Sequence, residues 1–177
     1  MIYPCNIAMW MLLIFSFLNY KTTPFASNFA VYVFYMGLFG GLIGLVFNIN
    51  FFSNPNLGNY HILKGLLSHI TMLIGCIYLL TGKYVKIGMK NIIPVSIGYA
   101  LMIIHGYALI ALFKIYNIDT PNIMFLMESP FPEYPFISIW SIGLVAFVLL
   151  FTFLHIYECI KYKKEDRWYN KISNYRN

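Results

Sequence analysis

The chain has 177 residues, of which 60% are hydrophobic, 19% aromatic and only 10% charged, and its mean hydropathy is +0.69. Soluble domains carry about 25% charged and about 45–50% apolar residues, so this composition excludes a water-soluble domain and predicts an integral membrane protein. The net charge of +6 does not indicate a nucleic-acid-binding protein, because the basic residues lie in short loops and in the tail of residues 161–177, without a nucleic-acid-binding motif.

Long apolar windows predict an all-α, polytopic bundle of transmembrane helices with five visible spans. A spanning helix needs about 20 residues, with a range of about 17–25, and the last four windows meet this length. The first window is short, so it either spans with help from its neighbours or follows sequence that is missing here. Residues 1–160 are thus predicted to form one transmembrane domain and residues 161–177 a basic tail. The windows cover about residues 4–19, 29–49, 61–81, 92–113 and 136–160.

The first window carries Cys5 near its start, directly after Pro4. A helix N-terminus lowers the pKa of a thiol, and the thiolate is the nucleophilic form. A histidine within reach can take the proton, as in other Cys–His pairs. The alternative is that Cys5 is a small buried hydrophobic residue. We expect Cys76 and Cys159 to be of this second kind, and the spacing of the three cysteines predicts no disulfide framework.

The second window contains Gly37, Gly40, Gly41 and Gly44, which form two pairs of small residues four positions apart. Such pairs let helix backbones approach closely, so this face is expected to pack against another helix. Room for a lipid is the alternative. The same pattern is compatible with a helix-mediated oligomer.

The third window carries Ser68, His69 and Thr71 in its first half. Polar side chains at membrane depth are costly and commonly mark function, so His69 is the first candidate for a functional group. A hydrogen bond between helices is the alternative. His61 brings no HExxH pattern or carboxylate with it, so neither a metal site nor another cofactor is predicted. His105, in the middle of the fourth window, is a candidate second polar group in the same cavity.

The charges in the loops predict how the chain is oriented in the membrane. The loop of residues 83–90 holds three lysines and no acid, and the tail of residues 161–177 is basic. Cytoplasmic loops carry the excess of Lys and Arg, which places these two segments and Lys21 in the cytoplasm. The loops of residues 48–60 and 117–135 then lie outside.

This orientation brings the polar candidates to the outer face. Cys5 lies at the outer end of the first window, and His69 lies on the order of 10 Å below the same boundary at 1.5 Å per residue. The loop of residues 117–135 is at that face too, and connections of this length are often functional. The apolar run of residues 123–127 predicts a segment that dips back into the interface, and a solvated acidic loop is the alternative.

Several short motifs, which together span almost the whole chain, resemble those of the YwaF-type integral membrane proteins. In that family a Ser-His pair in one helix is followed, two helices later, by an Asn-Tyr-x-Phe-Leu stretch and a proline. Ile123 here replaces the usual tyrosine, and Tyr3 stands where a histidine often precedes the cysteine. Members usually have six helices, which implies that the first helix of the family is absent here. The matching residues are Ser68-His69, Asn122-Ile123-Met124-Phe125-Leu126, Pro130 and Tyr3-Pro4-Cys5-Asn6.

The resemblance implies a function as well as a fold. An animal branch of the family comprises lipid acyltransferases that use a cysteine and a histidine. Carried over, Cys5 is the nucleophile that accepts an acyl group as a thioester, and His69 is its general base, with Ser68, His105 and Asn122 expected to bind substrate. We therefore expect a multi-pass cell-membrane protein whose partners are lipids, acting as a phospholipid acyltransferase or acyl hydrolase. The alternative is a non-catalytic transport or accessory protein with a polar, histidine-lined cavity.

Overall fold

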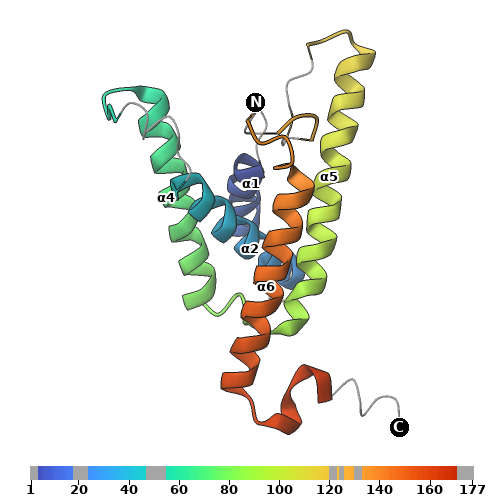
Figure 1. Ribbon diagram of the computed structural model, residues 1–177. Helices are drawn as coiled ribbons and strands as arrows, with labels where there is room; N and C mark the ends of the chain where they lie inside the picture. The colour runs from blue at the N-terminus through green and yellow to red at the C-terminus, as the bar shows by residue number, and fades with distance from the viewer. Residues whose placement is uncertain are drawn as a thin grey trace.

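The computed structural model describes residues 4–17, 24–46, 55–119, 123, 126–129 and 133–170, and every regular element within them is helical. Figure 1 shows the helices as one assembly, in which α2 crosses behind α6 and lies between α4 on the left and α5 on the right. The elements are α1 (Pro4–Ser16), α2 (Pro24–Val46), α4 (Tyr60–Thr81), η1 (Met89–Asn91), α5 (Ile92–Ile115), α6 (Ile139–Lys161) and η3 (Lys164–Asp166).

The described residues contain four helices that are long and apolar enough to cross a membrane. They confirm the predicted multi-pass architecture. The first predicted span, residues 4–19, forms the 13-residue helix α1, which is shorter than the range of about 17–25 residues for a span. Five spans are therefore not confirmed. The four long segments are Phe25–Val46, Tyr60–Thr81, Met89–Ile115 and Trp140–Lys161.

Local capping signals set where the helices begin. Helix α2 starts at Pro24, ahead of the predicted residue 29, because the fixed φ of proline suits the first helical turn. At the start of α4, the Asn59 side chain accepts a hydrogen bond of 2.9 Å from the backbone N–H of His61. At the start of α6, Ser138 and Ser141 form a reciprocal capping box. Asn59 lies just outside the predicted window of residues 61–81, whereas Ser138 and Ser141 lie inside that of residues 136–160. Hydropathy therefore places the start of α4 to within one residue and the start of α6 three residues early.

Helix α2 is the centre of the bundle. Residues 30–35 are consecutive and all buried, so this stretch of the helix is enclosed on every side. A helix that is hydrophobic all round belongs in an interior, and α2 packs against α1, α4 and α5. Its hydroxyl-bearing aromatic residues Tyr32 and Tyr35 are therefore buried at membrane depth.

The glycines of α2 form its contact with α4, as predicted from their spacing. A Cβ atom added to Gly37 would lie 2.7 Å from Cys76 Sγ, and one added to Gly41 would lie 2.7 Å from Leu73 Cδ2. The residue numbers run in opposite directions, so the two helices are antiparallel. The buried Cys76 thiol donates a hydrogen bond of 3.3 Å to the carbonyl of Phe34, which fits the structural role expected for this cysteine.

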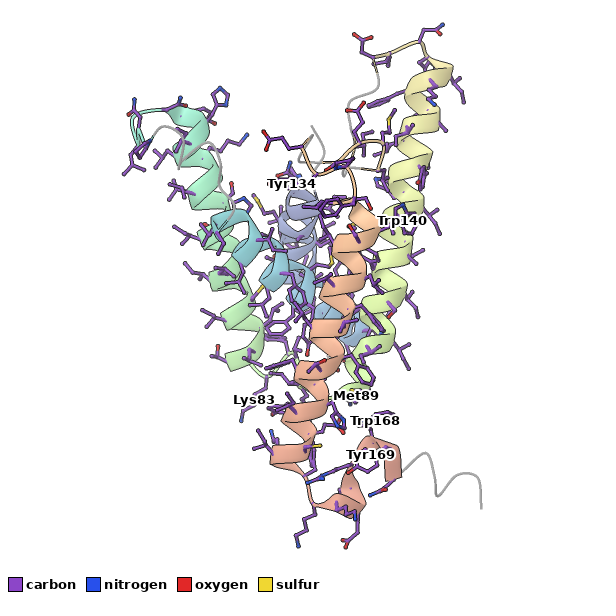
Figure 2. All side chains as sticks on the ribbon, viewed as in Figure 1. Lys83, Met89, Tyr134, Trp140, Trp168 and Tyr169 are labelled. Atoms are coloured by element: carbon purple, nitrogen blue, oxygen red, sulfur yellow. The ribbon has the colours of Figure 1, made fainter. Side chains whose placement is uncertain are left out.

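The loop before α5 and the segment after α6 lie at the same end of the molecule. Glu158 of α6 is buried and accepts hydrogen bonds from the backbone N–H groups of Met89 at 2.7 Å and Trp168 at 3.2 Å. Figure 2 shows Lys83 and Met89 at this end with Trp168, and Tyr134 at the opposite end. The two lysine-rich segments thus share one face, as the loop charges predict.

Candidate functional site

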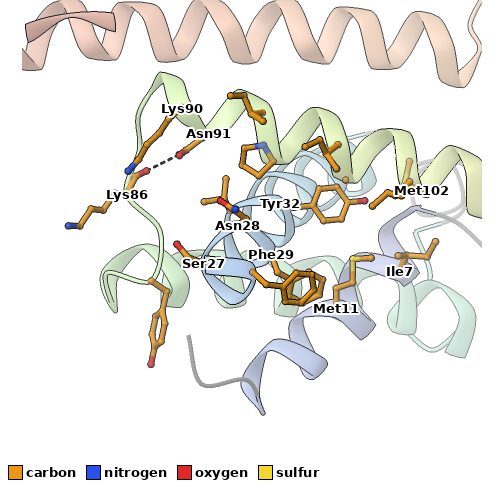
Figure 3. A pocket seen from close by; sticks show the side chains of 18 of the residues that line it. Ile7, Met11, Ser27, Asn28, Phe29, Tyr32, Lys86, Lys90, Asn91 and Met102 are labelled. Atoms are coloured by element: carbon orange, nitrogen blue, oxygen red, sulfur yellow. Dashed lines mark hydrogen bonds between the residues drawn. The ribbon is translucent and has the colours of Figure 1, made fainter. Parts of the chain in front are cut away.

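A groove of about 1120 Å³ runs between α1, α2 and α5 and reaches the loop that joins α4 to α5. We call it the α1–α2–α5 groove. In Figure 3, Lys86 and Lys90 lie at one end, Tyr32 near the middle, and Ile7 and Met102 at the other end. The lining residues are Ile7, Met11, Phe25, Ser27, Asn28, Phe29, Val31, Tyr32, Lys83, Tyr84, Lys86, Lys90, Asn91, Ile93, Pro94, Ile97, Gly98, Leu101, Met102 and His105.

The body of the groove is apolar and opens outward along α5. Ile93, Ile97 and Leu101 are spaced four residues apart, so they form one stripe of the helix. They are 65%, 57% and 60% exposed, respectively. Such exposure is favourable for large aliphatic side chains only against another apolar medium. This wall therefore suits contact with acyl chains.

Tyr32 of α2 contacts α5 in the wall of the groove. Its ring lies flat against Gly98, where an added Cβ would overlap the ring atoms. The side chain is 5% exposed, and its hydroxyl is buried without a hydrogen-bond partner among the described residues. A buried, unpaired hydroxyl costs about 1–3 kcal/mol. Tyr32 is thus a polar group kept in the wall of an apolar groove at a cost in stability.

One end of the groove is strongly cationic. Lys83, Lys86 and Lys90 all line it, and all three side chains are exposed. None of the three ammonium groups forms an ion pair or a hydrogen bond within the described part of the chain. The nearby carboxylate of Glu158 is already occupied by two backbone N–H groups. The three lysines at this end therefore have no ion-pair partner in the described part of the chain.

The lysine loop is held in a defined shape. Lys83 ends α4 in the left-handed region with φ 60°, where the N–H of Tyr84 bonds to the carbonyl of Leu79 at 3.0 Å. Asn91 is 2% exposed and donates a hydrogen bond of 2.8 Å to the carbonyl of Lys86. These contacts fix the loop backbone on both sides of Lys86 and direct the lysines to one end of the groove.

Of the predicted substrate-binding residues, His105 lines this groove, at the end away from the lysines. Its side chain is exposed rather than buried among polar groups. His69 is not among the lining residues, so the two histidines do not share this cavity. The groove is chiefly apolar, unlike the polar, histidine-lined cavity considered from the sequence.

His69 instead lies where α4 packs against α2. A Cβ atom added to Gly44 would overlap the imidazole ring, so ring and helix backbone are in direct contact. The Nδ1 atom is buried without a hydrogen-bond partner among the described residues. The hydrogen bond between helices, considered as the alternative role of His69, is thus not seen in the described part of the chain.

Ser68 lines a second, smaller pocket of about 320 Å³ between α1 and α4. Met9 of α1 lies in the same pocket, and Leu12 of α1 lies against Gly75 of α4. Residue numbers therefore increase in the same direction along the two helices, so α1 and α4 are parallel. Cys5 is one turn before Met9 in α1, while its side chain falls outside the described part of the structure. The predicted contact of Cys5 with His69 therefore stays a prediction.

The predicted substrate-binding residue Asn122 lies outside the described residues. Its neighbour Ile123 is fully buried and packs with Met102 and Ile110 of α5. The described part of this loop thus contacts the protein interior at Ile123, while the dip of residues 123–127 into the membrane interface stays a prediction.

A second cysteine and histidine pair lies at the end of α6. Trp168 Nε1 donates a hydrogen bond of 3.1 Å to His155 Nδ1, which leaves the proton of a neutral imidazole on Nε2. Nε2 lies 3.7 Å from Cys159 Sγ. A protonated Nε2 cannot accept the thiol proton, so this pair lacks the general base that a nucleophilic cysteine needs.

Nearby, the hydrogen bond to Tyr169 raises the pKa of the Arg167 guanidinium, which stays charged.

The cationic end of the groove was not expected from the sequence, where its three lysines indicated only the orientation of the chain. The available signal was three lysines in eight residues without an acid. Within the described ranges, no group of three His, Cys, Asp or Glu side chains is placed to hold a metal ion. Comparison of the chain with family models, curated proteins and solved structures found no match. The resemblance to the YwaF-type proteins therefore stays a prediction.

Proposed function

We propose that this multi-pass membrane protein binds a membrane lipid, with one acyl chain lying in the α1–α2–α5 groove. The observation that carries the proposal is the shape and chemistry of the groove, an apolar channel with a cationic end. Its volume of about 1120 Å³ slightly exceeds the range of about 300–1,000 Å³ typical of ligand pockets. From Asn91 to His105 along α5 it extends about 21 Å, more than half of a hydrocarbon core of about 30 Å.

Cross-linking with a photoactivatable phospholipid, followed by mass spectrometry of the labelled peptides, tests this function. We expect labels on residues of the groove wall, such as Ile97. Leu101→Trp narrows the groove and is expected to reduce this labelling at least threefold. Leu149→Trp is the matched control, because Leu149 is 58% exposed on α6, close to the 60% of Leu101, and does not line the groove. Equal labelling of groove and α6 peptides would contradict the proposal.

We further propose acyl transfer through Cys5 as the chemistry that accompanies lipid binding. The parallel packing of α1 on α4 supports it, because the first turn of α1 carries Cys5 beside the half of α4 that holds Ser68 and His69. The Cys5 thiolate would attack the ester carbonyl of a phospholipid, and the ester C–O bond would break. The leaving alkoxide would take the proton held by His69, leaving an acyl thioester. A lysophospholipid hydroxyl, or water, would then attack that thioester.

A clickable acyl phospholipid distinguishes this chemistry from binding alone. Wild-type protein is expected to acquire an acyl label that hydroxylamine removes, as a thioester requires. Cys5→Ala should abolish the label, while Cys159→Ala, which removes a partly exposed thiol of α6, should retain it. If Cys5→Ala labels as strongly as wild type, the protein binds lipid without forming a thioester there.

We also propose that the lysine-bearing end of the bundle faces the cytoplasm, together with the C-terminus. The positive-inside rule supports this orientation, because Lys83, Lys86 and Lys90 share their end with Lys161 and Arg167. The acids of the opposite loop, Asp119 and Glu128 among them, would then lie outside.

A further inference from the structure

We propose that the cationic end of the α1–α2–α5 groove binds the phosphate of an anionic phospholipid, so that the protein selects its lipid by headgroup charge. This inference rests on the proposed lipid-binding function and adds the class of lipid. Basic pockets between membrane helices on the cytoplasmic side are known to favour anionic headgroups. Here the pocket and the acyl-chain channel are parts of one continuous groove.

The first support is the concentration of positive charge. Lys83, Lys86 and Lys90 lie at one end of an apolar groove without an ionic partner in the described part of the chain. A phosphate bound there would be attracted by ammonium groups that no carboxylate of the described residues already pairs. A zwitterionic headgroup offers the same phosphate but adds a quaternary ammonium, which the lysines repel.

The second support is the orientation of α2. This helix begins at Pro24, and Ser27 and Asn28 of its first turns line the same groove as the lysines. A helix N-terminus carries partial positive charge, which favours a phosphate. The polar side chains of Ser27 and Asn28 add donors for the phosphate or the glycerol oxygens.

The third support is depth. The lysine loop follows the end of the spanning helix α4 and precedes the spanning helix α5. Headgroups lie at this level of a bilayer, next to the ends of the hydrocarbon core. A lipid with its phosphate at Lys86 would therefore have its acyl chain beside Ile97 and Leu101, further along the groove. A single lipid would thus place its phosphate at the lysines and its acyl chain in the apolar part of the groove.

Competition against the photoactivatable lipid, with full-length protein in detergent micelles, tests the selection. The competitors are phosphatidylglycerol and phosphatidylcholine with identical acyl chains. We expect phosphatidylglycerol to compete at least tenfold better at low salt, with a smaller difference at 0.5 M salt because screening weakens the lysine contacts. Each lysine is expected to contribute roughly a fivefold preference.

The variant Lys83→Asn/Lys86→Gln/Lys90→Gln removes the three charges, and asparagine suits the left-handed backbone at residue 83. It should lose the preference for phosphatidylglycerol and bind both lipids equally. The matched control is Lys161→Gln/Lys163→Gln/Lys164→Gln, which removes three charges at the same end outside the groove and should retain the preference.

The outcomes separate the two proposals. Equal competition by both lipids in the wild type, or an equal loss of preference in the control variant, would overturn headgroup selection and leave the lipid-binding groove in place. Absence of competition by either lipid would instead overturn the proposed lipid-binding function itself.

Discussion

The imidazole ring of His69 on α4 lies directly against the backbone of Gly44 on α2. This contact joins a polar residue of one long apolar helix to a residue that has no side chain on the other. The closeness of the two helices at this level depends on the missing Cβ, since the ring occupies the space where it would be. His69 is therefore held in one place by packing, whether or not it also takes part in chemistry.

Gly44→Ala should lower the free energy of unfolding by about 1–3 kcal/mol, because the added methyl overpacks the interface with His69. This loss should outweigh the gain of about 0.5–1 kcal/mol that alanine brings to a helix. Thermal unfolding in detergent can be followed with a thiol-reactive dye that reports exposure of the buried Cys76, in a background without the other cysteines. In a His69→Ala background the same substitution should be neutral or stabilising. An equal loss in both backgrounds would show that the contact is not the cause.

Glu158→Gln should destabilise the end of the bundle by about 1–3 kcal/mol. Each oxygen of its carboxylate accepts a hydrogen bond, one from the N–H of Met89 and the other from the N–H of Trp168. The amide of glutamine has an NH₂ group in place of one oxygen, so one backbone N–H would face another donor. Hydrogen exchange of these two amides should become faster in the variant. Glu165→Gln alters an exposed acid of η3 and should change stability by less than about 0.5 kcal/mol. Unchanged exchange at Met89 would contradict the role given to Glu158.

Much of the fold could be predicted from the sequence because a bilayer imposes a length on its helices. The four long windows each became a spanning helix, and the spacing of Gly37 and Gly41 identified a packed face. The groove could not be predicted in the same way. Helices α2 and α5 are apolar on all sides, so their periodicity does not say which faces meet. Only their packing brings Tyr32 to Gly98 and the lysine loop to one end of the channel.

Single-cysteine labelling is expected to place the lysine-bearing end in the cytoplasm. In a background without native cysteines, a membrane-impermeant thiol reagent should label Asn56→Cys in intact cells. Lys163→Cys should be labelled only after the membrane is permeabilised. Both positions are exposed, so accessibility within the protein does not limit either reaction. Labelling of Lys163→Cys in intact cells would reverse the orientation and move the cationic end of the groove to the outer leaflet.

Tyr32→Phe and Tyr35→Phe remove the same hydroxyl from neighbouring buried positions of α2, yet we expect opposite effects. The Tyr32 hydroxyl is buried and has no hydrogen-bond partner in the described structure, so its removal should raise the free energy of unfolding by about 1 kcal/mol.

The Tyr35 hydroxyl accepts a hydrogen bond of 3.3 Å from Asn91, which fixes the lysine loop, so its removal should cost about 0.5–1.5 kcal/mol. For a chain of this size, each kcal/mol shifts the melting temperature by about 2–4 °C, a difference that thermal unfolding of the lipid-free protein resolves. Equal losses in the two variants would mean that the Tyr32 hydroxyl has a partner too. The same pair of variants also tests the groove. If the Tyr32 hydroxyl forms a hydrogen bond with a bound lipid, Tyr32→Phe should bind lipid more weakly although it folds more stably.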